Sequence, residues 1–132
     1  MSNTIAAIIL TKDEEKHIAR CINSLKGVCE EVFVIDCFSS DRTKAVAESL
    51  GAKVYQHPWK NYATQFNWGL HHCPITADWV WRIDADEFLD KGLGQSVKKA
   101  VAECEDDVNG IYVRKRIDEY RGILHTRRHL AA

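Results

Sequence analysis

The sequence predicts an α/β domain with a mostly parallel sheet and helices on both faces. Short apolar runs recur along the chain, and each is followed by a stretch with helical periodicity or helix-capping residues. Continuous apolar runs of this kind are typical of strands that are covered on both faces. Strands that alternate with helices favour a parallel sheet joined by right-handed crossovers. The length of 132 residues suits one domain, residues 1–132.

The first predicted strand is the apolar run TIAAIIL at residues 4–10. A helix is predicted over residues 11–27, because Thr11 and Glu14 have the spacing of a capping box and Gly27 suits the position after a helix end. The apolar stripe of this helix consists of Ile18, Ile22 and Leu25.

The second predicted strand is EVFVID at residues 31–36, and a second helix follows it and ends near Gly51. The residues that offer oxygens to cap this helix are Ser39, Ser40 and Asp41. A third strand, AKVYQH, is predicted at residues 52–57.

Two further strand and helix pairs complete the pattern. A helix is predicted over residues 59–72, and the residues expected to face inward are Tyr62, Phe66, Gly69 and Leu70. The fourth strand is DWVWRID at 78–84, and it is followed by a helix at 94–104 and a strand at 110–116. Residues 118–132 show no clear period, so no element is predicted there.

Composition excludes several classes of function. The formal net charge of −1 gives no electrostatic case for binding nucleic acid or an anionic membrane. The apolar run near the start is too short for a membrane span or a signal sequence, which predicts a cytoplasmic protein. The five cysteines form no C-x-x-C pair, and we expect them to be reduced and mostly buried.

An acidic cluster stands at the end of the fourth strand, in the stretch WVWRIDADEFLD. In an extended segment Asp84 and Asp86 share one face and repel each other, which predicts a cation beside them. That cation is either an arginine such as Arg82, which would make the cluster structural, or a metal ion. The remaining acids of the cluster are Glu87 and Asp90.

Polar residues from three strands are expected to meet at one edge. Thr11, Asp36 and Asp84 each end a strand, and open α/β sheets bind ligands beyond the carboxyl ends of their strands. The sequence has neither G-x-G-x-x-G after the first strand nor a P-loop, so phosphates need another partner. We expect Asp84 and Asp86 to hold Mg²⁺ or Mn²⁺, which complete their shells with water and phosphate oxygens. A haloacid dehalogenase phosphatase is excluded, since its D-x-D closes the first strand.

Other metal-site patterns are weaker. His71 and His72 stand beside Cys73, but adjacent side chains point in different directions. His125 and His129 have helical spacing without the glutamate of an H-E-x-x-H site. We expect structural or surface roles for these residues.

Four stretches resemble, in order and spacing, the donor-binding half of family 2 glycosyltransferases of the GT-A fold. They are AIILTKDEEKHIARCINSL, EVFVIDCFSSDRT, GAKVYQHPWKNYATQFNWGL and DWVWRIDADEFL. The resemblance covers roughly residues 4–116. It implies a Rossmann-like nucleotide-diphospho-sugar transferase fold and a metal-dependent, inverting transfer of a sugar from a nucleoside diphosphate sugar to a sugar or lipid-linked acceptor, in polysaccharide or lipopolysaccharide biosynthesis.

The resemblance also implies roles for individual residues. Thr11, Asp13 and Glu14 match a motif that contacts the base and ribose, and Asp36 matches an aspartate that bonds to the nucleobase. The residues implied to support the site from the third helix are Gln65 and Asn67. Asp84 matches the partner of the ribose or the metal, and Asp86 the direct ligand of the ion.

Structural alternatives exist for several of these residues. Thr11 is equally well explained as a helix cap, and Asp41 is better explained as a cap than as a ligand. Gln65 and Asn67 also fit a partly exposed helix face. The tryptophans fit core positions or pocket walls, and they are Trp59, Trp68, Trp79 and Trp81.

The sequence departs from the family pattern in three ways. Many relatives have an apolar or aromatic residue in place of Lys12 and asparagine in place of Asp13, so this chain carries more charge at the rim of the pocket. Many relatives have a small residue or glycine where this chain has Cys37 and Phe38, and a phenylalanine there is expected to narrow the nucleotide pocket. Relatives also continue into an acceptor-binding half that supplies the general base. We expect most of that half to be missing, and the only late acids, Asp118 and Glu119, are not identifiable as the base.

Two other functions remain open at this point. One is a catalytically silent, truncated module that binds a nucleotide or assembles as a homodimer. The other is a nucleotidyltransferase, which the absence of a Gly-rich basic loop after the first strand disfavours. For a glycosyltransferase of this kind, a peripheral position at the inner membrane face is an alternative to a purely cytoplasmic one.

Overall fold

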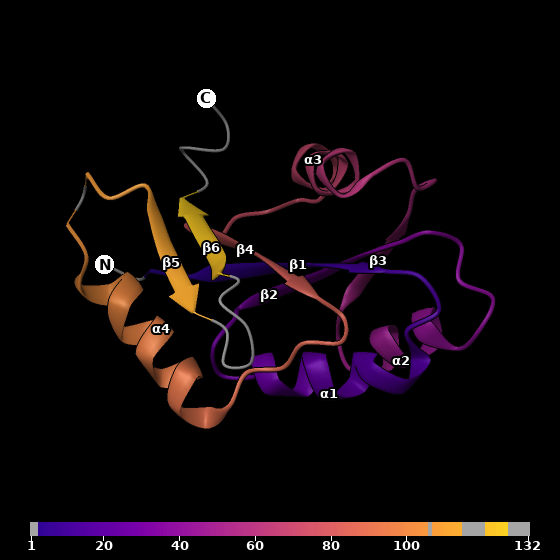
Figure 1. The fold of residues 1–132 in the computed structure, drawn as a ribbon, viewed down its shortest axis with the longest axis horizontal. Helices are drawn as coiled ribbons and strands as arrows, with labels where there is room; N and C mark the ends of the chain where they lie inside the picture. Colours follow the sequence, from indigo (N-terminus) through magenta and orange to yellow (C-terminus); the bar gives the residue numbers. More distant parts are fainter. Residues whose placement is uncertain (1–2, 106, 115–120, 127–132) are drawn as a thin grey trace.

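The computed structural model describes residues 3–105, 107–114 and 121–126. Its strands form one six-stranded sheet in the order β3-β2-β1-β4-β6-β5 (Figure 1). The parallel strands are β1 (Ile5–Thr11), β2 (Glu31–Asp36), β3 (Lys53–Gln56) and β4 (Trp79–Asp84). β6 (Arg121–Thr126) pairs antiparallel with β4 and with β5 (Gly110–Arg114). The predicted mostly parallel sheet is therefore confirmed.

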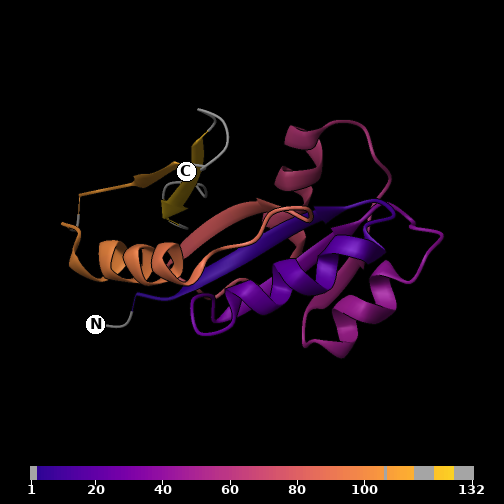
Figure 2. The same ribbon diagram turned by 60° about the horizontal axis from the view of Figure 1, so that its bottom comes forward.

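Helices cover both faces of the sheet, as predicted (Figures 1 and 2). One face carries α3 (Tyr62–His72) alone. The other face carries α1 (Glu15–Leu25), α2 (Thr43–Ser49) and α4 (Lys91–Glu103).

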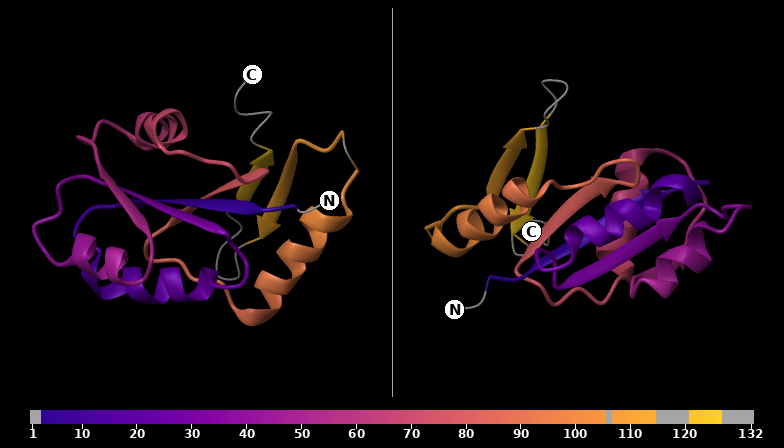
Figure 3. Two further views of the ribbon diagram at one scale, coloured as in Figure 1. Left: turned by 180° about the vertical axis from the view of Figure 1, so that it is seen from behind. Right: turned by 90° about the horizontal axis from the view of Figure 1, so that it is seen from below.

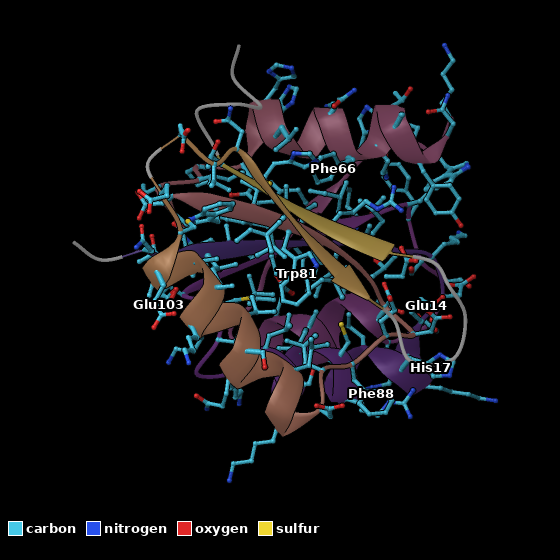
Figure 4. The ribbon with its side chains drawn as sticks, turned by 60° about the vertical axis from the view of Figure 1, so that its left-hand side comes forward. Glu14, His17, Phe66, Trp81, Phe88 and Glu103 are labelled. Atoms are coloured by element: carbon cyan, nitrogen blue, oxygen red, sulfur yellow. The ribbon has the colours of Figure 1, made fainter. Side chains whose placement is uncertain are left out.

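Two hydrophobic cores fill the spaces between the sheet and these helices. Side chains of a strand alternate between its faces, so β1 contributes Ile9 to the core beneath α1 and Leu10 to the core beneath α3. Figure 4 shows one aromatic residue of each core, with Trp81 on the α1 and α4 side and Phe66 between α3 and the sheet. This alternation also fixes which face each polar residue at the strand ends occupies.

The third helix is shorter and oriented differently from the prediction. It begins at Tyr62, after Asn61, whose side chain accepts a hydrogen bond from the Thr64 N–H at 2.8 Å. Tyr62 was expected to face inward but is 57% exposed, whereas Gln65 is fully buried. The close approach of α3 to the sheet depends on Gly69, where an added Cβ would lie 3.0 Å from a β2 side chain.

The last two strands lie side by side at one edge of the sheet, next to α4 (Figure 3). β5 matches the strand predicted at 110–116, and β6 falls in a stretch for which no element was predicted. In the part of the chain that the structure describes, no helix combines the length and the apolar character that crossing a membrane requires.

Candidate functional site

The carboxyl ends of the four parallel strands lie on one side of the molecule (Figure 1). Thr11 pairs with Asp36 across β1 and β2, Asp36 pairs with Gln56 across β2 and β3, and Asp84 pairs with Leu10 across β4 and β1. The three strand-end residues expected to meet at one edge therefore do so. Gln56 joins them, although the sequence interpretation did not single it out.

The residues at this edge divide between the two faces of the sheet. Thr11 and Asp36 follow Ile9 and Val34 by two positions and share their face, on the side of α1 and α2. Asp84 is in register with Leu10 and therefore lies on the side of α3. The expected single group of side chains is in fact two groups on opposite sides of the strand ends.

Asp36 is the centre of a closed hydrogen-bond network. One carboxylate oxygen accepts from the hydroxyl groups of Thr11, at 2.6 Å, and Ser39, at 2.5 Å, and the other accepts from the Ser39 N–H at 2.9 Å. Burial by itself raises the pKa of Asp36, but hydrogen bonds from Ser39, Thr11 and Gln56 outweigh this effect and hold the pKa below its ordinary value. Asp36 is fully buried, so its carboxylate makes its hydrogen bonds to other groups of the protein.

Thr11 is part of this network and does not cap a helix. It is the last residue of β1, and α1 begins four residues later, at Glu15. The structural alternative of a capping box with Glu14 is therefore wrong. The carboxylate of Glu14 instead lies 3.1 Å from the ring Nδ1 of His17 (Figure 4).

The loops after β1 and β2 are joined by hydrogen bonds. A carboxylate oxygen of Asp13 accepts from the N–H of Ser40 at 2.7 Å and from its hydroxyl at 3.2 Å. The N–H of Asp13 donates to Ser39 Oγ at 2.8 Å, and the N–H of Glu14 donates to Thr43 Oγ1 at 2.9 Å. Asp13 and Glu14, which the resemblance assigns to the donor, thus both lie where the two segments meet. Asp13 contributes its carboxylate and its N–H to this contact, and Glu14 contributes its N–H.

Asp41 has a structural role at the start of α2, as the sequence favoured, although the N-cap residue of that helix is Arg42. Its carboxylate accepts from the N–H of Thr43, at 2.9 Å, and from the Thr43 hydroxyl, at the start of α2. It also accepts from the Glu15 N–H at 3.1 Å, so it connects the first turns of two helices. The Thr43 hydroxyl is the main reason that the pKa of Asp41 is lowered. The hydroxyls of Ser39 and Ser40, which were also offered as caps, are bound to Asp36 and Asp13.

Phe38 has a left-handed backbone, with φ of 48°, and its side chain is 58% exposed. This conformation is unfavourable for a residue with a bulky side chain, and glycine adopts it without strain. The backbone is held by two hydrogen bonds, from its N–H to Gln56 Oε1 at 2.8 Å and from Lys12 Nζ to its carbonyl at 3.0 Å. A glycine, which is one of the residues expected near this position from the family pattern, would relieve the strain, whereas another small residue would keep the Cβ that causes it.

The acidic segment after β4 is a turn and not an extended strand. The N–H of Glu87 donates to the Asp84 carbonyl at 2.9 Å, and the Glu87 carboxylate accepts from the Asp84 N–H at 2.8 Å. Asp86 lies inside this turn, so the argument that it shares a strand face with Asp84 is wrong. Asp90 caps α4 by accepting from the Leu93 N–H at 2.7 Å. Glu87 and Asp90 therefore each accept a structural hydrogen bond from a backbone N–H.

Among the acids of this segment, Asp86 has the carboxylate most open to a cation that takes few protein ligands. Asp84 is half-buried and Asp86 is exposed, and no hydrogen bond or ion pair engages the Asp86 carboxylate within the described ranges. Those ranges also contain no group of three or more His, Cys, Asp or Glu side chains that could hold a metal. Two carboxylates suffice for Mg²⁺ or Mn²⁺ when water and phosphate oxygens supply the other ligands. A site of this composition would be completed by a phosphate-containing ligand.

Arginines approach this region without closing on Asp86. The guanidinium of Arg20 lies 3.5 Å from the backbone carbonyl of Asp86, and that of Arg82 lies over the ring of Tyr62, 5.6 Å from its centre. The arginine alternative for the cation is therefore not realised at the Asp86 carboxylate.

Gln65 and Asn67 occupy different environments. Both ends of the Gln65 amide bind His57, through its carbonyl at 3.0 Å and its ring Nδ1 at 2.7 Å. Gln65 therefore fixes the segment between β3 and α3 from a fully buried position. Asn67 is exposed on the outer side of the helix.

The tryptophans divide between core and surface. Trp79 and Trp81 are buried in the core on the α1 side. Trp68 stacks on a histidine ring at each face, with centroid distances of 4.5 and 4.2 Å. Trp59 is 43% exposed and meets the ring of Tyr62 edge-on. Trp59 is thus the most exposed of the four tryptophans.

Some residues singled out in the sequence lie outside the described ranges. They are Asp118, Glu119 and His129. His72 lies within them, and its ring Nδ1 is 2.8 Å from the Trp68 carbonyl while its ring stacks on the indole. These contacts indicate a structural role for His72, as expected.

Comparisons with known sequences agree with the resemblance. The family model described as glycosyl transferase family 2 matches residues 6–131. An uncharacterized glycosyltransferase of Rickettsia conorii is 42% identical over 107 residues, which cover 81% of this chain and 37% of that protein. The lipopolysaccharide core biosynthesis glycosyltransferase LpsC of Rhizobium meliloti is 32% identical over 117 residues, covering 85% of this chain and 42% of that protein. The chain thus spans about two fifths of the length of these curated relatives.

Solved structures share the fold at low sequence identity. Mannosyl-3-phosphoglycerate synthase from Rubrobacter xylanophilus has a TM-score of 0.76 and 18% identity, covering 94% of this chain and 53% of that one. Glucosyl-3-phosphoglycerate synthase from Mycobacterium tuberculosis, in complex with Mn²⁺, UDP and glucosyl-3-phosphoglycerate, has a TM-score of 0.72 and 16% identity, covering 96% and 58%. These similarities confirm the Rossmann-like GT-A fold.

Proposed function

Because the chain belongs to glycosyltransferase family 2, we propose that its carboxyl-edge site binds a nucleoside diphosphate sugar together with Mg²⁺ or Mn²⁺. The observation that carries the proposal is the Asp86 carboxylate, which is exposed at the strand ends and engaged by no side chain of the described residues. A solved structure of the same fold contains Mn²⁺ and UDP, which supports this assignment.

In this proposal Asp84 and Asp86 hold the cation. When bound, the ion supplies Lewis-acid stabilisation of the departing diphosphate. Asp36 and Thr11 organise the loops beside the nucleotide, since their polar groups bind each other and Ser39. Gln65 supports the site through His57, as the resemblance implied for this helix.

Transfer to an acceptor hydroxyl with inversion also needs a base to remove the proton of that hydroxyl. No carboxylate of this chain is assigned that role. The relative LpsC, named for lipopolysaccharide core biosynthesis, supports a sugar of a lipid-linked saccharide as the acceptor class. The inverting outcome, the cytoplasmic location and a homodimer remain predictions.

Calorimetric titration of UDP and GDP, with Mn²⁺ and with EDTA, tests the proposal. We expect one nucleotide to bind at least tenfold more tightly with Mn²⁺, and Asp86→Asn to remove that gain. The matched control is Asp107→Asn, which changes another exposed aspartate, on the segment between α4 and β5 at the opposite edge of the sheet. Equal affinity with Mn²⁺ and EDTA, or an unchanged Mn²⁺ effect in Asp86→Asn, would disprove the assignment.

A further inference from the structure

Helix α1 holds the acidic segment after β4 at three positions. The thiol of Cys21 lies 3.7 Å from the Asp84 carbonyl, and Ser24 Oγ accepts from the Leu89 N–H at 3.0 Å. Arg20 contacts the carbonyl of Asp86, which lies between Asp84 and Leu89 in the sequence, at 3.5 Å. Ser24 stands four residues after Arg20 and three after Cys21, and both spacings bring side chains together on a helix surface, so the segment runs along one side of α1.

Arg20 is itself held by an aromatic ring. The carbon at the centre of its guanidinium lies 4.2 Å from the centre of the Phe88 ring, within the range of a cation–π contact. Phe88 is 51% exposed, so it contributes little to the core, and Figure 4 shows it beside α1 on the segment that leads to α4. The contact thus joins the residue two positions after Asp86 to the helix.

The charges of this region converge on Cys21. Burial raises the pKa of its thiol to about 12, and the negative charges of Glu87, Asp84 and Asp86 act in the same direction while Arg20 opposes them. Arg20 contacts this segment at the backbone of Asp86. Because it meets the carbonyl of Asp86 and not its carboxylate, it leaves that carboxylate available to a ligand.

We propose that Arg20, resting on Phe88, is a positioning residue that holds the turn containing Asp86 in the arrangement needed to bind the divalent cation. The proposal rests on the proposed function, in which Asp84 and Asp86 are the ligands. Asp86 has no side-chain partner within the described ranges, so its place depends on how its backbone is held. Groups that orient metal ligands in this way typically change metal affinity 10- to 100-fold when they are removed.

The test measures the affinity of Mn²⁺ for the UDP-saturated chain by electron paramagnetic resonance of free Mn²⁺. We expect Arg20→Gln and Phe88→Leu each to weaken Mn²⁺ binding about tenfold, while UDP affinity in EDTA and the melting temperature stay unchanged. Arg20→Lys should fall between, because an ammonium group does not reproduce the stacking of a planar guanidinium. The double variant should lose little more than either single one, since both remove the same contact.

The matched control is Lys16→Gln, which removes an exposed charge from the same helix one turn away. We expect it to change Mn²⁺ affinity less than twofold. If the wild type binds Mn²⁺ with UDP and Arg20→Gln binds it equally well, or if Lys16→Gln weakens it as much, the positioning role is wrong while the proposed function stands. If the wild type shows no Mn²⁺ binding, the proposed function fails and the positioning role fails with it.

Discussion

Asp36 and Asp86 allow the same chemical change to be made in two opposite environments. Asp36→Asn places an amide N–H₂ where a carboxylate oxygen now accepts the Ser39 N–H at 2.9 Å. The other oxygen, which accepts from Thr11 and Ser39, is retained. A hydrogen bond to a charged group contributes about 1.5–3 kcal/mol. We therefore expect Asp36→Asn to lower the free energy of unfolding by about 3 kcal/mol.

Urea unfolding followed by tryptophan fluorescence measures this loss, since the chain has four tryptophans. Asp86→Asn is the control, because no hydrogen bond of the described residues engages its carboxylate, and its effect should lie within about 0.5 kcal/mol of zero. A loss below about 1 kcal/mol in Asp36→Asn, or equal losses in the two variants, would refute the view that Asp36 is a structural centre.

The pH dependence of stability gives a second measure of the same network. The pKa of Asp36 is lower in the folded chain than its ordinary value near 3.8. The unfolded state therefore binds the proton more readily, and the stabilisation is present above that value and is lost as the pH falls through the lower folded pKa. Asp36→Asn should reduce the acid sensitivity of the unfolding free energy below about pH 4. A curve that coincides in shape with that of the wild type would contradict the assignment.

Three further predictions concern packing, strain and thiols. Gly69→Ala should lower the free energy of unfolding by about 1 kcal/mol in the urea assay, because overpacking outweighs the gain in helix propensity. Gly92→Ala should raise the free energy of unfolding slightly in the same assay, because its added Cβ meets nothing closer than 3.5 Å. Phe38→Gly should leave stability unchanged or raise it by up to about 1 kcal/mol, since it relieves a left-handed backbone at an exposed residue, and a loss above about 1 kcal/mol in urea would contradict this. Cys21 and Cys73 should react with Ellman's reagent at pH 8 only after unfolding, because burial raises the pKa of each thiol to about 12; fast labelling of either in the native chain would show otherwise.

Three of the parallel strands, β1, β2 and β4, could be predicted from the sequence because each is a mainly apolar run with a length that a buried strand requires. The predictions at 31–36 and 78–84 agree with β2 and β4 to within one residue. β6 could not be predicted, since its sequence RGILHT has neither alternation nor a sustained apolar run. It is placed by antiparallel pairing with β4 and β5, which is a tertiary effect.

Errors at the site arose where a local pattern had two physical explanations. The spacing of Thr11 and Glu14 fits a capping box, but the strand extends through Thr11 and its hydroxyl binds Asp36 across the sheet. The i and i+2 spacing of Asp84 and Asp86 implies one face only while the chain remains extended, and the strand ends at Asp84. In both places the outcome depends on where β1 or β4 ends, which periodicity does not resolve to one residue.

Other features of the site depend on partners distant in sequence. Gln65 is buried because His57, eight residues earlier, satisfies both ends of its amide, whereas an unpaired amide in that position would be costly. Gln56 is the last residue but one of the third predicted strand and could have been identified there, since the pairing of that strand with β2 brings it beside Asp36. The role of Arg20 could not be predicted from the sequence, because a single arginine on a helix has the pattern of any solvated charge. Its contact with Phe88 is visible only in the structure.

The groups around Asp36 and those around Asp86 differ in how completely the protein satisfies their hydrogen-bonding atoms, and this difference separates structural support from ligand binding. Around Asp36 the hydroxyl, amide and carboxylate groups bind one another, so a ligand would have to break hydrogen bonds to reach them. Around Asp86 the backbone is held by α1 while the carboxylate is left without a partner among the described residues. An exposed carboxylate on a held backbone can bind a ligand without the loss of any hydrogen bond of the protein. We therefore expect substitutions around Asp36 to affect folding and those around Asp86 to affect affinity.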